Sequence, residues 1–222
     1  MRRIYAIFVL SLLVCSAYAQ TPFYLSKQGV VLKCENRDAK DKATSITELT
    51  VTDVDYTDAQ NFKTKVSHNL IDLKTKKVIV LNVTHPVTVE NGVTTFVPTS
   101  LVAPSSVVEG LIVEGDNMVF PATLKVGDTL NDYTLTLNVA GVKTQTTMHS
   151  QVVDREETVT IDGHDIECIV VKGKQDAKVL FVRTKMSHEI WYGRGYGPII
   201  TKNYDKKGKL VSSQVLVSIS GL

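Results

Sequence analysis

Two stretches near the C-terminus decide the fold class: Glu189-Ile-Trp-Tyr-Gly-Arg-Gly-Tyr-Gly-Pro-Ile-Ile200 and Tyr204-Asp-Lys-Lys-Gly-Lys209, the second followed by a run to Ser220. Together they are typical of strand, glycine corner, strand, tight turn and strand. In the turn, Gly208 suits the left-handed conformation that a β-carbon penalises. Residues 211–220 then alternate with a period of two, which predicts a strand with one largely apolar face. That face carries Val211, Val215, Val217 and Ile219.

The same organisation extends toward the N-terminus. Residues 29–55 contain β-branched side chains around the charged segment 35–42, as in a hairpin with an exposed tip. Segments 61–72 and 77–84 flank a lysine-rich turn in the same way. Asn91-Gly92 and Asp162-Gly163 are turn pairs that tolerate positive φ. Roughly a dozen strands, spaced by about 8–15 residues, predict an all-β antiparallel fold.

Three further segments refine this expectation. Leu135, Leu137 and Val139 alternate with polar residues as in a half-buried strand. Residues 179–182 (Val-Leu-Phe-Val) are apolar on both sides, which predicts a strand covered on both faces. Pro121 is expected at a strand end or edge. The one helix we expect is short, near residues 99–110, where Ser105 or Ser106 would cap it and Gly110 would end it.

The first 19 residues are typical of a secretory signal peptide. Arg2 and Arg3 precede the apolar run 4–14, and Ala17-Tyr18-Ala19 places small residues at the expected cleavage site after Ala19. The apolar run is short for a transmembrane anchor, which needs about 20 residues. Lipidation at Cys15 is disfavoured because Val14 stands where a small residue is wanted. Residues 20–222 are therefore expected to form a single β-rich domain, with no transmembrane segment.

The charge balance limits the classes of partner that the protein is expected to bind. The leader holds two of the 25 basic residues and none of the 23 acidic ones, so the mature chain is neutral when histidine is uncharged. This balance argues against nucleic acid, which requires a basic stripe. A basic amphipathic helix would indicate a peripheral membrane role, and we find none in the sequence.

Three motifs occur in an order that resembles a known family: Leu124-Lys-Val-Gly-Asp-Thr-Leu130, Gly163 with Glu167-Cys168, and the segment from Trp191. The chain resembles a family of uncharacterised exported proteins of Gram-negative anaerobes that share a domain of unknown function. The resemblance is carried mainly by residues from Pro121 onward. It departs at Tyr196, where Val is frequent, and residues 145–150 do not align.

The resemblance implies an antiparallel spiral β-roll or strongly curved sheet, located in the periplasm or at the outer envelope, with no established reaction. The positions that it carries over are structural ones: Gly127, Cys168, Trp191, Gly195 and Gly197.

Cys34 and Cys168 remain after removal of the leader. In an oxidising compartment they are candidates for one disulfide. The alternative is that each is a small buried side chain, since Cys168 lies in the apolar segment 166–171.

The glycine-rich segment 193–197 superficially suggests a phosphate loop. A dinucleotide site needs a helix after its glycines, whereas Pro198-Ile-Ile-Thr continues as a strand. The segment therefore indicates a bend, and we expect no cofactor.

His164, Asp165 and Glu167 beside Cys168 raise the question of a metal site or a Cys–His pair. Strand alternation leaves two ligands at most on one face, where a structural zinc site uses four. A nucleophilic Cys168 would need a histidine from elsewhere, and His188 is the candidate. We therefore expect no catalytic or metal site and keep a hydrolase as a second alternative.

Trp191 and Tyr192, with Gly195, Tyr196 and Gly197, are the candidate ligand-binding residues. An aromatic pair beside glycines is able to wall a shallow pocket for a lipid, sugar or peptide. The competing interpretation is that Trp191 anchors the core and its indole N–H bonds a carbonyl.

Two modification motifs are present. Asn82-Val-Thr84 is an N-glycosylation sequon, which matters only in a eukaryotic secretory route. Thr129 within Asp128-Thr129-Leu130 matches a short O-glycosylation motif of some exported bacterial proteins, and also suits an ordinary turn.

The sequence thus favours an exported, non-catalytic envelope protein that binds or scaffolds through a curved β-surface. A periplasmic carrier of a lipid or other hydrophobic ligand is the first alternative, because a curved sheet can enclose an apolar cavity. Expected partners are a lipid or another envelope protein.

Overall fold

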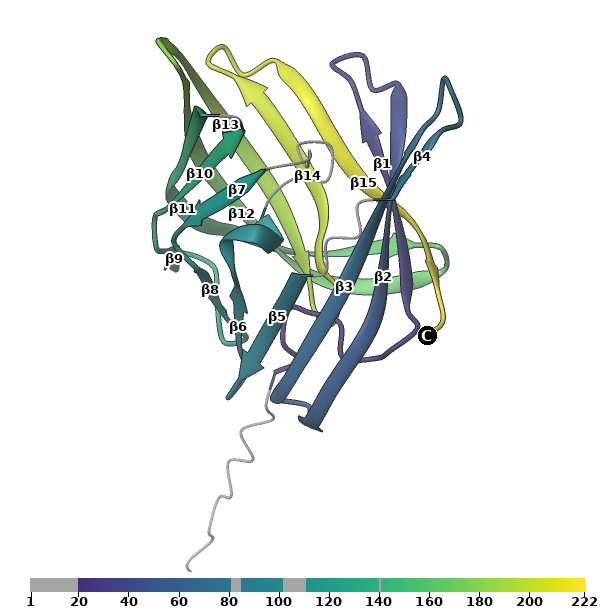
Figure 1. Cartoon of the computed structure of the whole chain (residues 1–222). Helices are drawn as coiled ribbons and strands as arrows, with labels where there is room; N and C mark the ends of the chain where they lie inside the picture. The colour runs from purple at the N-terminus through teal and green to yellow at the C-terminus, as the bar shows by residue number, and fades with distance from the viewer. Residues whose placement is uncertain (1–19, 81–84, 102–110, 140) are drawn as a thin grey trace, which may run out of the picture.

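The computed structural model describes residues 20–80, 85–101, 111–139 and 141–222. In these residues 15 strands join one antiparallel sheet, which curls strongly into a half-barrel (Figure 1). The all-β, antiparallel, strongly curved fold expected from the sequence is confirmed. In chain order the strands are β1 (Val31–Arg37), β2 (Ala43–Asp58), β3 (Asn61–Asp72), β4 (Val78–Val80), β5 (His85–Glu90), β6 (Val93–Phe96), β7 (Ile112–Gly115), β8 (Met118–Pro121), β9 (Thr129–Leu130), β10 (Tyr133–Val139), β11 (Val142–Ile161), β12 (His164–Val179), β13 (Val182–Gly193), β14 (Gly197–Asp205) and β15 (Leu210–Ser220).

The strand order explains the curl. Neighbouring strands follow the path β7-β10-β11-β12-β13-β14-β15-β1-β2-β3-β5-β6-β8, with β4 added to β3 and β9 to β11. The last strand pairs with the first, from Val31 opposite Ser220 to Arg37 opposite Ser213. The two ends of the path, β7 and β8, are consecutive in sequence and are separated only by residues 116–117. The sheet must therefore bend until its two edges approach each other.

The meander gives the half-barrel two distinct ends. The turns β1–β2, β12–β13 and β14–β15 lie at one end, which is uppermost in Figure 1. The turns β11–β12 and β13–β14 lie at the opposite end, which we call the lower end; in Figure 1 the β11–β12 turn projects to the right, near the C-terminus.

The expected tight turns are present. Asn91 and Gly92 have φ values of 50° and 75°, and Asp162 and Gly163 have 51° and 80°. Gly208 adopts φ 78° in the β14–β15 turn. Pro121 is the final residue of β8, a strand end as expected.

Two strands run further than the sequence pattern suggested. Residues 142–161 form the single strand β11, with register shifts between His149 and Val152 and between Val153 and Arg155. β12 continues through Gly173 without a break. A β-carbon on Gly173 would lie 2.5 Å from Nε2 of His188, so the glycine makes room for the imidazole ring within the sheet.

Residues 179–182 do not form the covered strand that we expected. They make the tip of the β12–β13 hairpin, where Val179 pairs with Val182 and Leu180 and Phe181 form the loop. Phe181 is 98% exposed. An apolar run alone does not distinguish a buried strand from an exposed turn, and the neighbouring strands do not extend far enough to cover this one.

The predicted apolar face of β15 is also wrong. The buried residues are Ser213, Leu216 and Ile219, whereas Val211 and Val217 are exposed. A bulge is the cause: Lys33 faces Ser218 but Cys34 faces Leu216, so Val217 is skipped and the alternation reverses.

Of the expected short helix near residues 99–110, the described residues include the start, where Pro98–Leu101 form a 3-10 turn. Residues 102–110 lie outside the described part of the chain, so the rest of this helix stays a prediction. No helix in the described ranges has the length and hydropathy needed to cross a bilayer.

Candidate functional site: a cavity in the curled sheet

The curled sheet surrounds a cavity of about 680 Å³. Its lining comes from both halves of the sheet, with Leu32 and Leu49 on one side and Leu135 and Ile190 on the other. A volume of this size falls within the range of about 300–1,000 Å³ that is usual for small-molecule sites.

The lining changes from apolar to polar along the strands. On β1 the side chains Leu32, Cys34 and Asn36 line the cavity in that order. On β2 the partners of these residues are Leu49, Thr47 and Ser45, which also line the cavity. Successive same-face residues lie about 6.6 Å apart, so the change spans about 13 Å. The polar end lies toward the upper end of the half-barrel.

The polar end is built from neutral side chains that bond one another across strands. Asn36 donates its amide protons to Ser45 Oγ at 3.0 Å and Thr47 Oγ1 at 2.9 Å. Gln214 donates to Asn36 Oδ1 at 2.9 Å, and Asn203 donates to Ser212 Oγ at 3.2 Å. Arg37, the cationic residue of the lining, is held by Glu35 and Asp41. The polar lining therefore offers hydrogen bonds rather than a free charge.

Two histidines lie beside the apolar end, because His68 pairs with Leu49 and His85 pairs with Val66. His68 lines the cavity, and its ring centre lies 5.5 Å from that of buried His85. Burial, with a smaller contribution from His85, lowers the pKa of His68 to about 4. Burial also lowers the pKa of His85. Both rings are therefore neutral at neutral pH.

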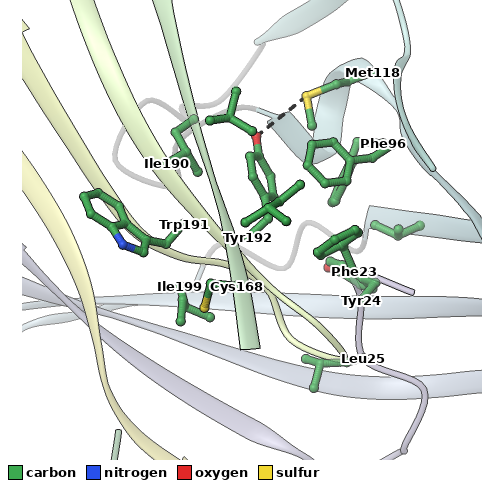
Figure 2. Packing of buried hydrophobic residues seen from close by; sticks show 14 of the residues in the cluster. Phe23, Tyr24, Leu25, Phe96, Met118, Cys168, Ile190, Trp191, Tyr192 and Ile199 are labelled. Carbon is green, nitrogen blue, oxygen red and sulfur yellow. Dashed lines mark hydrogen bonds between the residues drawn. The ribbon is translucent and has the colours of Figure 1, made fainter. Parts of the chain in front are cut away.

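Aromatic and sulfur-containing side chains form the apolar end. Tyr192 on β13 donates its hydroxyl to Met118 Sδ at 3.9 Å, and its ring centre lies 4.2 Å from that of Phe120 (Figure 2). This contact joins β13 to β8 across the interior. Burial raises the pKa of Tyr192 well above its usual value, so the group stays neutral. Tyr192 and Tyr196, two of the candidate pocket residues, both line the cavity, and their role in ligand binding stays a prediction.

Trp191 does not belong to the cavity. It projects from the side of β13 opposite to Tyr192 (Figure 2). Its indole N–H donates to Glu157 Oε2 at 3.2 Å, and the cations of Arg155 and Lys202 lie 5.3 and 5.1 Å from its ring centre. The ring is 4% exposed and belongs to the buried hydrophobic cluster, and these charged side chains contact it. The expected carbonyl partner is in fact a carboxylate.

The glycine-rich segment 193–197 holds the N-terminal segment in place. Gly195 N–H donates to Pro22 O at 2.7 Å. Arg194 donates to Thr21 O at 3.2 Å, Ala122 O at 2.9 Å and Gln20 Oε1 at 3.3 Å, and its guanidinium lies 4.6 Å from the ring centre of Phe23. Gly197, at φ 86°, leaves room for the ring of Tyr24. This loop is therefore a clamp at the lower end, and its bonds explain the glycines without a phosphate.

The clamped segment was missed in the sequence analysis. Phe23, Tyr24 and Leu25 are buried beside the core residues of β8 and β13 (Figure 2). They fill the lower end of the half-barrel without belonging to a strand. The available signal was the dense apolar cluster Phe23-Tyr24-Leu25 directly after the cleavage site.

The structure does not bring Cys168 together with a histidine. His188 is opposite Gly173, five residues along β12 from Cys168, a separation of about 17 Å. His164 is exposed and lies four residues away in the other direction. The Cys–His arrangement considered for a hydrolase is therefore not assembled, and the described residues contain no group of three or more potential metal ligands.

Cys34 and Cys168 are separate, buried free thiols. Four strand spacings along the path β12-β13-β14-β15-β1 separate them, or about 19 Å measured along the sheet. A disulfide requires Cα atoms within about 7 Å, so the suggested bridge does not form in this fold. Burial raises the pKa of each thiol to about 12.

The remaining candidate positions are structural or lie outside the described residues. Gly127, at φ 93°, donates its N–H to Val153 O at 2.8 Å and forms a corner. Thr129 is exposed at the start of β9, and its O-glycosylation stays a prediction. The sequon residues Asn82 and Thr84 lie outside the described part.

The fold defines a class of single-sheet half-barrels, which two solved structures share. An exported protein with a YmcC-like fold from Bacteroides fragilis is 20% identical, with a TM-score of 0.76, and the alignment covers 90% of this chain and 100% of that one. A lipoprotein from Parabacteroides distasonis is 16% identical, with a TM-score of 0.78, over 90% of this chain and 99% of that one. At these identities the likeness concerns the fold alone.

The chain belongs to the DUF3108-like family, whose sequence profile matches residues 27–216. None of the curated proteins matches the chain. The expected resemblance to a family with a domain of unknown function is thus confirmed, while an origin in a Gram-negative anaerobe stays a prediction for this chain.

Proposed function

We propose that this protein is an envelope binding protein whose curled sheet holds a small amphipathic molecule. The carrying observation is the cavity of about 680 Å³, whose lining changes from apolar to hydrogen-bonding along β1 and β2. A ligand with an apolar body and an uncharged polar group matches both ends. This proposal unites the expected binding role with the carrier that the sequence analysis held as an alternative.

Three features support a ligand at this place. The apolar end is walled by rigid rings and by Met118, which adapt well to an apolar surface. The hydroxyl of Ser213 is buried in the lining without a hydrogen-bond partner, although a buried hydroxyl normally has one. His68 is neutral and Arg37 is paired with Glu35 and Asp41, so the lining carries no unpaired cation that would demand an anionic ligand.

An envelope location fits this role. The leader is typical of an exported protein, and the two structural relatives are described as an exported protein and a lipoprotein. An amphipathic molecule in an aqueous envelope compartment needs its apolar part shielded from water, and a half-barrel supplies that shielding.

Binding of a neutral apolar fluorophore, N-phenyl-1-naphthylamine, tests the proposal. Leu49 lines the cavity at its apolar end, so Leu49→Trp would fill part of the space and should weaken binding at least about tenfold. Thr50→Trp adds the same side chain to the opposite face of β2 and should leave binding unchanged. Circular dichroism would verify that both variants fold.

Equal binding by the wild type and Leu49→Trp would place the fluorophore elsewhere and contradict the proposal. If neither the wild type nor the polar-end variant Asn36→Ala bound the fluorophore, that result would also contradict a cavity for amphipathic ligands.

A further inference from the structure

The tip of the β12–β13 hairpin carries apolar side chains that the described part of the chain leaves exposed. Val182 is 67% exposed, Leu180 59% and Phe181 98%. Val142 and Ile112 are exposed nearby, at 45% and 55%. We call these three hairpin residues, together with Val179 and Val142, the apolar tip.

The register brings these residues to the same end of the sheet. Thr144 on β11 pairs with Val179, so Val142 lies beside the β12–β13 loop. Ile112 on β7 pairs with Asn138, which pairs with Lys143 on β11. β13 rises to this corner at the upper left of Figure 1. The apolar tip is thus a projecting corner rather than part of the core.

Turn formation does not explain the composition of this loop. Two other two-residue loops of the sheet use Asn91-Gly92 and Asp162-Gly163, which tolerate positive φ. The β12–β13 loop uses Leu180-Phe181, and Leu180 adopts φ 51°. A leucine is strained at this φ, and the loop gains no buried contact in return. Contact with an external surface that accepts these side chains would supply the missing stabilisation.

Basic side chains surround the apolar tip. Lys178 and Arg183 pair across the hairpin directly behind Val179 and Val182. Lys143 lies beside Val142, and Lys185 follows two residues after Arg183. Asp176 is the acidic residue of this part of the hairpin, and it lies 3.6 Å from Lys185 Nζ and 3.6 Å from His149 Nε2. Cations therefore predominate immediately behind the apolar residues.

We propose that the apolar tip docks the protein on an anionic phospholipid bilayer. Leu180 and Phe181 enter the boundary between headgroups and acyl chains, while Lys143, Lys178 and Arg183 face the lipid phosphates. Two to three residues of a strand span about 7–10 Å, which matches the depth of about 5–10 Å reached by interfacial segments. Clustered basic residues near an anionic surface add electrostatic attraction.

The charge pattern selects a lipid surface over a second copy of this chain. Two copies meeting at their apolar tips would bring the cations of one beside the cations of the other, and like charges in contact disfavour association. An anionic bilayer complements both the apolar residues and the cations. The inference stands independently of the ligand proposed for the cavity, since none of the residues of the apolar tip lines it.

Co-sedimentation of the processed protein with vesicles tests this inference. The wild type should bind vesicles of phosphatidylcholine mixed with phosphatidylglycerol, and added salt should weaken binding. Phe181→Gln should reduce the partition coefficient at least about tenfold, because burial of a phenyl ring in the bilayer is lost. Lys178→Gln combined with Arg183→Gln should weaken binding to anionic vesicles and remove most of the salt dependence.

The matched control is Tyr56→Gln, which removes an exposed aromatic residue from β2 (54% exposed) and should leave binding unchanged. A Phe181→Trp variant should show a blue shift of its emission with anionic vesicles, over the constant signal of buried Trp191. Absence of vesicle binding by the wild type, or equal binding by Phe181→Gln, would overturn the proposal. If the wild type instead formed a dimer that Phe181→Gln dissociates, and did not bind vesicles, the proposal would be overturned in favour of self-association.

Discussion

At the scale of single residues, buried or clamped polar groups carry the most specific information. Arg194 joins three oxygen acceptors and the ring of Phe23, although the sequence presents it as one residue of a glycine-rich loop. Three histidines are buried enough to stay neutral. His188 has both ring nitrogens buried without a hydrogen-bond partner, and its pKa is lowered to about 4 by burial and then by His149.

Replacing Arg194 with Ala should destabilise the fold by about 2–3 kcal/mol, because charge-assisted bonds to Thr21 and Ala122 are lost. Urea unfolding of the processed chain measures this change, and limited proteolysis should show earlier cleavage near residues 20–25. Arg183→Ala is the control, since Arg183 is exposed at the hairpin tip, and it should change stability by less than about 0.5 kcal/mol. Equal stability of the two variants would contradict the clamp.

Stability should fall with acid between about pH 6.5 and pH 4. The folded-state pKa values of His68 and His188 are lowered to about 4, whereas unfolded histidine titrates near 6.5. Between these values the unfolded state binds more protons, so stability is full above about pH 6.5 and is lost as pH falls toward 4, by on the order of 3 kcal/mol per histidine.

Chemical denaturation at several pH values measures how the free energy of unfolding changes with pH. The variant His188→Leu should show a weaker dependence on pH. A pH-independent unfolding free energy across this interval would show that the rings are not buried in neutral form.

Both cysteines should titrate as free thiols without reductant. In the native protein they should react slowly with a thiol reagent, because they are buried and their pKa values are raised to about 12. In denaturant the count should reach two per processed chain. A count of zero until reductant is added would establish the disulfide that the sheet spacing argues against.

At the scale of elements, local turn chemistry was predictable and pairing between distant strands was not. Asn91-Gly92 and Asp162-Gly163 were identified because the positive φ of each turn is a property of those residues themselves. The prediction of the apolar face of β15 was wrong because a bulge in the pairing of β15 with β1 reverses the alternation, and no local signal marks that bulge. The prediction of a covered strand at residues 179–182 was wrong because the exposure of these side chains depends on where the neighbouring strands end.

Gly173→Ala tests the continuity of β12. An added β-carbon would lie 2.5 Å from His188 Nε2 and 2.9 Å from Gln151 Cγ. The variant should lose about 1–3 kcal/mol through overpacking. Thermal unfolding measures the loss, and Ala177→Ser, which changes a half-buried position on the same strand, is the control. If Gly173→Ala were as stable as the wild type, the imidazole would not pack over the strand as described.

At the scale of the whole molecule, the sheet topology produces the candidate site. Pairing of β15 with β1 unites two meanders, and the short β7–β8 connection draws the outer edges together. The N-terminal segment closes the lower end, and the cavity grades from apolar to polar toward the upper end. From the sequence, Tyr192 and Tyr196 were selected as candidate pocket residues, together with Trp191, Gly195 and Gly197. Leu49, Asn36 and Gln214 were not, because only the closed sheet brings their faces together.

The most direct test of the cavity as a ligand site is native mass spectrometry of the protein extracted gently from the cell envelope. Our account predicts a fraction of molecules carrying additional mass from a small amphipathic molecule, and Leu49→Trp should reduce that fraction while Thr50→Trp should preserve it. A bare protein mass for the wild type under conditions that preserve folding would contradict the binding role.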